Sequence, residues 1–180
     1  MVRALVAAGA PLDHVNNLGW TALMEAVVLG DKRPHLAAMV CIRFPIVGKW
    51  AERKRISFTT YTDLSAKPEV LELLRSEVEK VNATLPEPQR IRDFLLLYKE
   101  LDADDEELTR TRKVRRGVIN EKYGGIIEAI YRGERAIPVD TTIAFQDGTR
   151  QRIRTTLRVV NMRGAADGAA PARTMAQAAE

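Results

Sequence analysis

The segment IRDFLLLY at residues 91–98 is short and strongly apolar, which is typical of a strand buried within a sheet. A second run of this kind, HLAAMVCI at residues 35–42, lies upstream. Between them, the apolar residues of 68–85 recur at spacings of three and four, which predicts a helix with one face toward a core. A proline at its first residue and Pro86-Glu87-Pro88 after its last mark the two ends. Strand, helix and strand in this order predict an α/β domain.

Two more helices and a hairpin complete the predicted α/β (α+β) unit. A proline opens a short helix over 45–53, and the apolar residues of 118–131 predict another amphipathic helix. Alternating apolar residues on both sides of Asp147-Gly148 predict a C-terminal β-hairpin. The remaining residues, 163–180, are rich in Ala and Gly and predict a mobile tail. The wet face of the hairpin carries four arginines: Arg150, Arg152, Arg154 and Arg158.

The bulk composition restricts the class of protein. The chain has 180 residues, of which 46% are hydrophobic and 29% charged, as in an ordinary globular protein. Its single cysteine, Cys41, cannot form an internal disulfide and lies in an apolar stretch, so we expect a buried thiol and a reducing cytoplasm. No apolar run approaches the ~20 residues of a membrane span. We therefore expect a cytoplasmic chain without a transmembrane segment, with peripheral contact at the inner membrane face as the alternative.

Part of the net charge of +4 lies in one run, TRTRKVRR at residues 109–116. Such a run can form a nuclear-localisation or nucleic-acid patch. However, no stacking aromatic residue is interleaved, and the acids of 102–107 just upstream would repel phosphates. We therefore expect no nucleic-acid partner. The acids are crowded in a turn without a nearby histidine, which indicates a solvated loop and no metal site.

The first thirty residues have the order of a helix end, a turn and a new helix. LVAAGAPLD (5–13) ends a helix on its glycine, NNLG (16–19) is a turn cluster, and GWTALMEA (19–26) starts the next helix. This order resembles one ankyrin repeat, although a lone repeat cannot bury its own apolar face. We therefore expect an ankyrin-like helical remnant rather than a binding surface.

The segment 25–31 has two readings. It can finish the ankyrin-like helix, or it can form a strand beside residues 35–42, a choice that Val27 and Val28 favour. We expect the helix to give way to a strand near Ala26.

Several segments carry a resemblance that runs through loops as well as core positions. In chain order they are GDKRPHLAAMVCI, VGKWAERKRI, TTYTDLSAKPEV, EVEKVNATLP, RIRDFLLLYKELDADDEELTRTRKVRR and EKYGGIIEAIY. With the closing hairpin, these segments resemble the C-terminal lid of bacterial long-chain fatty acid–CoA ligases, which are AMP-forming adenylating enzymes. The resemblance implies a lid-type fold over 31–162, with the lid domain truncated at its start. Together with the ankyrin-like fragment at 1–30 and the tail at 163–180, this gives three predicted parts.

Within this resemblance, residues 108–116 align with the last core motif of adenylate-forming enzymes, and Lys113 falls on its essential lysine. The family reaction joins a fatty-acid carboxylate to the α-phosphate of ATP, and a compact ammonium between these anions stabilises the transition state. The resemblance thus implies that Lys113 is catalytic and that Arg116 supports it. Thr109 and Thr111 would shape the nucleotide-facing loop that presents the lysine.

The same resemblance implies an ATP-binding body ahead of the lid, and no phosphate-gripping loop appears upstream of Gly30. We therefore expect a partial ligase that is inactive alone and binds no cofactor by itself. ATP, Mg and CoA would belong to the intact enzyme, as would the fatty-acid substrate. Two alternatives stay open: an ankyrin-type protein-interaction module, and a lid that works in trans with a separate ligase body.

Overall fold

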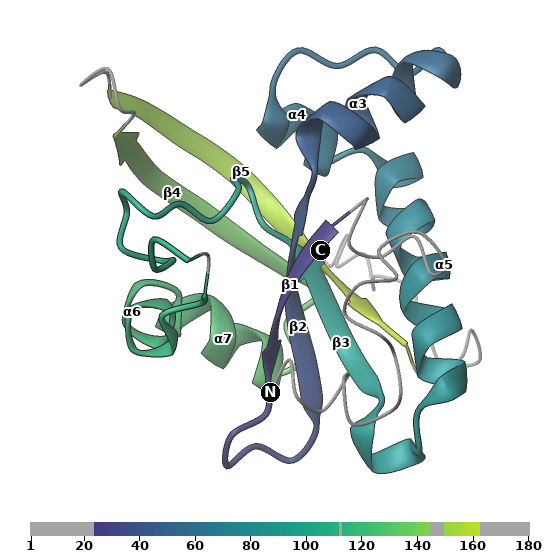
Figure 1. Cartoon of the computed structure of the whole chain (residues 1–180), viewed down its shortest axis with the longest axis vertical. Coiled ribbons are helices and arrows are strands. Elements are labelled where there is room, and N and C mark those ends of the chain that lie inside the picture. The colour runs from purple at the N-terminus through teal and green to yellow at the C-terminus, as the bar shows by residue number, and fades with distance from the viewer. Residues whose placement is uncertain (1–23, 112, 145–149, 163–180) are drawn as a thin grey trace, which may run out of the picture.

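The computed structural model describes residues 24–111, 113–144 and 150–162 (Figure 1). A short 3-10 turn, Glu87–Gln89, precedes β3. The helices and strands are, in chain order, β1 (Met24–Leu29), β2 (Leu36–Ile42), α3 (Phe44–Arg53), α4 (Tyr61–Ser65), α5 (Pro68–Thr84), β3 (Ile91–Leu96), α6 (Arg116–Lys122), α7 (Gly124–Tyr131), β4 (Ala136–Ala144) and β5 (Arg150–Asn161).

The described strands form one mixed sheet in the order β1-β2-β3-β5-β4. β2 and β3 are parallel and are connected through α3, α4 and α5, whereas every other neighbouring pair is antiparallel. The C-terminal end of the long strand β5 pairs with β3, and its remaining length pairs with β4. The two strands therefore project from the sheet as an arm, as Figure 1 shows. The predicted α/β fold class is confirmed.

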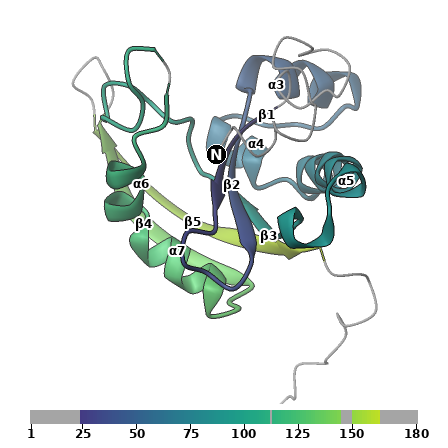
Figure 2. The same ribbon diagram turned by 60° about the horizontal axis from the view of Figure 1, so that its bottom comes forward.

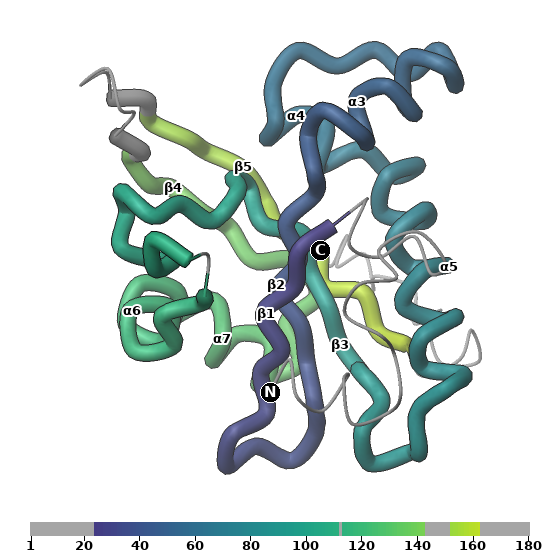
Figure 3. The backbone as a smooth tube through the Cα atoms, in the orientation of Figure 1, coloured from purple at the N-terminus to yellow at the C-terminus, as the bar shows by residue number. Residues whose placement is uncertain are grey.

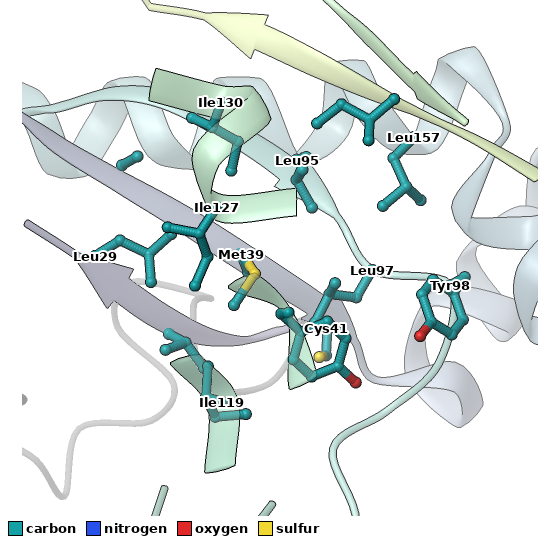
Figure 4. Close-up of a cluster of buried hydrophobic side chains, with 14 of the residues drawn as sticks. Leu29, Met39, Cys41, Leu95, Leu97, Tyr98, Ile119, Ile127, Ile130 and Leu157 are labelled. Carbon is teal, nitrogen blue, oxygen red and sulfur yellow. The ribbon is translucent and has the colours of Figure 1, made fainter. Parts of the chain in front are cut away.

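Helices cover both faces of the sheet (Figure 2). Along β2, Ala38, Val40 and Ile42 belong to one buried cluster with α3, α4 and α5. The intervening residues, among them Met39 and Cys41, belong to a second cluster with α6 and α7 (Figure 4). This division follows from the strand geometry, in which successive side chains point to opposite faces. The expected burial of Cys41 is confirmed, and that burial raises the pKa of its thiol to about 12.

The helix starts agree with the positions of the prolines. α5 begins at Pro68, and α3 begins one residue before Pro45. By contrast, the single helix expected over 118–131 is divided into α6 and α7 at Tyr123. Gly124 and Gly125 follow this residue, and consecutive glycines weaken a helix interior.

The segment before residue 30 is a strand rather than the end of a helix. β1 pairs antiparallel with β2 along its whole length, from Met24 opposite Ile42 to Leu29 opposite Ala37. The expectation that helix persists to Ala26 is wrong, because pairing satisfies the backbone there and buries Met24 and Val27.

Other expectations fall on residues that the structure does not describe. Residues 1–23 of the ankyrin-like repeat expected at 1–30, the hairpin turn at 145–149 and the tail at 163–180 lie outside the described residues. The proposed division into three parts therefore stays a prediction. In the described ranges, no helix combines the length and apolar character that crossing a bilayer requires.

Candidate functional site

Residues 107–111 and 113–115 lie side by side as the two sides of a tight hairpin, which we call the 107–115 hairpin and which carries most of the basic run (Figure 3). Leu108 and Val114 form an antiparallel bridge. The N–H of Thr109 donates to the carbonyl of Lys113 at 2.8 Å, and the N–H of Arg115 donates to that of Glu107 at 2.8 Å. Leu108 is buried and Val114 packs against the same apolar cluster, so the base of this hairpin is fixed in the core.

Three of the predicted site residues meet at the tip of the 107–115 hairpin. The N–H of Lys113 donates to the hydroxyl oxygen of Thr109 at 3.0 Å. The hydroxyl oxygens of Thr109 and Thr111 lie 3.0 Å apart. The two threonines thus close the loop locally, while the Lys113 side chain is exposed to solvent. The catalytic role of Lys113 stays a prediction.

The fourth predicted site residue, Arg116, lies elsewhere. It is the first residue of α6, and its guanidinium donates to the carbonyl of Val28 in β1 at 3.1 Å. Arg116 is therefore close to the tip in sequence but is held against the edge of the sheet. Its supporting role toward a nucleotide stays a prediction.

The acidic turn is not uniformly solvated, because the side chain of Glu107 is completely buried (0% exposed). The Tyr123 hydroxyl donates to its Oε1 at 2.7 Å, and Lys122 Nζ lies 2.8 Å from the same oxygen. Lys99 Nζ donates to Oε2 at 2.7 Å, and the N–H of Asp102 donates to it at 3.0 Å. The expectation of a solvated loop is wrong for Glu107, since the four donors offset the large cost of removing its carboxylate from water.

A second carboxylate completes the charge balance. Asp105 Oδ2 lies 2.6 Å from Lys99 Nζ and 3.3 Å from Lys122 Nζ. Two carboxylates therefore face two ammonium groups. We call Lys99, Asp105, Glu107, Lys122 and Tyr123 the Glu107 network.

The pKa shifts of Glu107, Asp105 and Lys99 all favour the charged forms of these side chains. Burial alone would raise the pKa of Glu107, but the hydrogen bonds from Lys122, Lys99 and Tyr123 outweigh it and hold the pKa below its ordinary value. Burial would likewise lower the pKa of Lys99, but the hydrogen bonds to Asp105 and Glu107 outweigh it and raise that pKa. Burial and the adjacent carboxylate raise the pKa of Tyr123, so its hydroxyl remains a donor.

Sequence reasoning missed the Glu107 network. Lys99 lies shortly after β3 and next to the buried Tyr98, and Lys122 and Tyr123 lie at the junction of α6 and α7, so each stands where the chain leaves the core. These positions were the available signal. No feature of the sequence distinguishes Glu107 from the acids around it, because its burial depends on segments far along the chain.

The described residues contain no group of three or more His, Cys, Asp and Glu side chains that could hold a metal ion. The binding of Mg²⁺, ATP and CoA by the intact family enzyme stays a prediction.

Comparisons with known proteins place these features in a family context. A family model described as AMP-binding enzyme C-terminal domain matches residues 10–135. The chain is 32% identical over 113 residues to the long-chain-fatty-acid–CoA ligase FadD15 of Mycobacterium tuberculosis, covering 62% of this chain and 19% of that protein. It is 28% identical over 108 residues to the putative fatty-acid–CoA ligase fadD11 of the same species, covering 60% of this chain and 19% of that protein. The match thus spans about a fifth of the length of these relatives.

Two solved structures also resemble the chain. They are the A-PCP didomain of the carboxylic acid reductase from Segniliparus rugosus, at 20% identity, and the adenylation domain of a carboxylate reductase from Mycobacterium chelonae, at 24% identity. Each match covers 73% of this chain, with 16% and 18% of the respective structure, at a TM-score of 0.47.

Proposed function

Since the chain belongs to the family of AMP-binding enzyme C-terminal domains, we propose that it serves as the lid of an AMP-forming long-chain fatty-acid–CoA ligase. One observation carries this proposal: the exposed Lys113 side chain projects from the tip of a hairpin whose base is buried in the core. The similarity to two mycobacterial proteins named as fatty-acid–CoA ligases supports the choice of a fatty acid as the substrate class.

The adenylation step requires a positive charge near two reacting anions. A carboxylate oxygen attacks the α-phosphorus of ATP, a new O–P bond forms, and the bond to pyrophosphate breaks. The two reacting anions repel, and negative charge gathers on the phosphorus oxygens as the transition state forms. An ammonium group that is free to approach both anions reduces this barrier without exchanging a proton. Lys113 fits the requirement, because its side chain is exposed and no described carboxylate forms an ion pair with it.

We further infer that the chain alone is catalytically silent and acts only with an ATP-binding body, either in trans or in a longer polypeptide. The matched family is the C-terminal domain of such enzymes, and the mycobacterial relatives extend far beyond the matched region. ATP, CoA and the fatty acid would then bind mainly to the body. An ankyrin-type interaction function would rest on residues 1–30, of which the structure describes 24–30, and 24–29 of these form β1.

ATP–pyrophosphate exchange with palmitate tests both parts of this proposal. We expect no exchange from the 180-residue chain alone, and restored exchange when the chain is added or fused to a ligase body that lacks its own lid. Lys113→Ala should abolish the restoration, whereas Lys49→Ala, which removes an exposed lysine of α3, should leave it unchanged. Palmitate-dependent exchange from the chain alone would show that it is not silent. Failure of both addition and fusion would rule out the lid function.

A further inference from the structure

We propose that Glu107 is the positioning residue for Lys113, and that its buried carboxylate sets where the tip of the 107–115 hairpin stands relative to the sheet. This inference rests on the proposed function, since it concerns the lysine that the function requires. In this role, Glu107 of the acidic turn orients the hairpin and does not itself contact ATP or the fatty acid.

The groups that meet at Glu107 come from three separate segments of the chain. Lys99 follows β3, the N–H of Asp102 belongs to the start of the acidic turn, and Lys122 and Tyr123 come from the junction of α6 and α7. One side chain therefore joins the hairpin to the sheet and to the helix pair.

A continuous set of backbone contacts connects Glu107 to the tip of the 107–115 hairpin. The carbonyl of Glu107 accepts from the N–H of Arg115, the Leu108–Val114 bridge follows, and the Thr109–Lys113 bonds close the loop. A two-stranded hairpin this short has little stability of its own, so its orientation depends on what holds its base.

The apolar and the polar contacts at the base of the hairpin differ in how strongly they depend on direction. Leu108 and Val114 hold the base through apolar contacts, which are non-directional. Hydrogen bonds depend steeply on angle and distance, so the four donors at Glu107 fix both the depth and the rotation of the base. The apolar contacts keep the hairpin attached to the core, and the carboxylate determines its orientation relative to the sheet.

The arrangement at Glu107 also discriminates between a carboxylate and an amide. All four partners are donors, and two of them address each oxygen. Glu107→Gln preserves the volume of the side chain but replaces one acceptor oxygen with a donating NH₂ group. The two donors that now bind one carboxylate oxygen would then face the NH₂ group, which is itself a donor, so the amide cannot accept all four hydrogen bonds.

Hydrogen exchange in the full chain tests the positioning directly. In Glu107→Gln, the amides of Thr109, Lys113 and Arg115 should exchange at least about tenfold faster, because the hairpin opens when its charged acceptor is lost. Amides of β2 and β3 should keep their rates. The matched control is Glu77→Gln, a change of a buried glutamate of α5 on the other side of the sheet, which should leave the hairpin amides unchanged. Unchanged exchange at the hairpin in Glu107→Gln would overturn the proposal.

ATP–pyrophosphate exchange with the lidless ligase body measures the effect of the same variants on catalysis. Glu107→Gln should lower the rate at saturating chain by about tenfold or more, while the chain concentration for half-maximal restoration stays the same, because docking does not involve a buried side chain. Lys113→Ala should abolish catalysis without accelerating the hairpin amides. If Glu107→Gln raised only the chain concentration for half-maximal restoration and left the rate at saturating chain unchanged, the positioning role would be overturned. Catalysis that survives Lys113→Ala would instead overturn the proposed function, so the two failures are distinguishable.

If Glu107→Gln prevents folding of the chain, Lys122→Met replaces it as the test. This change removes a single partner from Oε1 and leaves the carboxylate and Lys99 in place. The same three amides should exchange faster by a smaller factor, and no acceleration would overturn the proposal.

Discussion

On one face of the sheet, α3, α4 and α5 enclose a cluster of apolar side chains, whereas on the other face the apolar cluster of α6 and α7 borders a buried carboxylate with its lysines. Figure 2 shows the two layers on either side of the strands. Apolar burial supplies most of the free energy of folding but tolerates small displacements, while a buried charged network depends on geometry. The hairpin with Lys113 belongs to the second layer. The difference suggests that the first layer stabilises the domain and the second orients its loop.

The largest expected effect is on the apolar layer. Phe94 in β3 is fully buried in the cluster with α3, α4 and α5. Phe94→Ala should lower the free energy of unfolding by about 3–5 kcal/mol, because it removes apolar contacts and leaves a cavity. Urea denaturation at neutral pH measures the loss, with Ile46→Ala, at an exposed residue of α3, as the control. If Phe94→Ala lowered the free energy of unfolding no more than Ile46→Ala does, the stabilising role of the cluster with α3, α4 and α5 would be contradicted.

The second effect separates the layers by pH. The folded-state pKa of Glu107 is lowered, so its contribution to stability is present above the ordinary value of 4.5 and is lost as pH falls through the folded value. The pKa of Lys99 is raised, so its contribution is present below 10.5 and is lost as pH rises through the folded value.

The stability difference between wild type and Glu107→Gln should therefore be largest between these two values and should shrink in acid. The loss caused by Phe94→Ala should change little over the same range, because no charge is involved. Urea denaturation of the three proteins at a series of pH values measures both differences. A Glu107→Gln difference that persists unchanged in acid would show that the charge of Glu107 does not matter.

A smaller effect is expected from Tyr123→Phe, which deletes one donor to Glu107 and keeps the ring in the core. The loss should be about 1–3 kcal/mol, since a hydrogen bond to a charged acceptor disappears while three donors remain. Tyr131→Phe, which removes a hydroxyl bonded to the neutral carbonyl of His35, should cost less. Thermal or urea unfolding compares the two variants, and equal losses would contradict the special status of the charged acceptor.

The smallest effect is expected on the projecting arm of β4 and β5. Asp140 pairs with Arg152 through two contacts of 2.7 Å and with Arg154 at 3.0 Å, but all three side chains are exposed to solvent. Asp140→Asn should not measurably change the thermal midpoint, because exposed ion pairs are screened and gain little. A clear drop that disappears in high salt would show that the arm matters more for stability than its exposure implies.

The elements that the sequence predicts well are those with a local signal. Short apolar runs predict β2 and β3, and the apolar periodicity together with the prolines at its ends predicts α5. The structure confirms all three elements. β1 was ambiguous because Met24, Glu25 and Ala26 suit a helix, whereas the following valines suit a strand. Pairing with β2, a contact between segments, decided the outcome.

The candidate site divides in the same way. The expectation for Lys113 came from a resemblance in sequence, and the structure adds that Thr109 and Thr111 close the loop around it. The Glu107 network could not be predicted, because it brings together Lys99, Lys122 and Tyr123 from separate segments. A buried charge is a property of the folded arrangement rather than of the residues next to it.

The contact between Arg116 and Val28 has a consequence for the solubility of the domain. Among the described strands, β1 forms one outer edge of the sheet, and edge strands offer backbone groups to which another polypeptide can pair. The guanidinium of Arg116 occupies a carbonyl on this strand and adds a positive charge beside it. Charge on an edge strand disfavours intermolecular pairing, so the residue that the family resemblance assigns to the nucleotide also helps to protect this edge from aggregation.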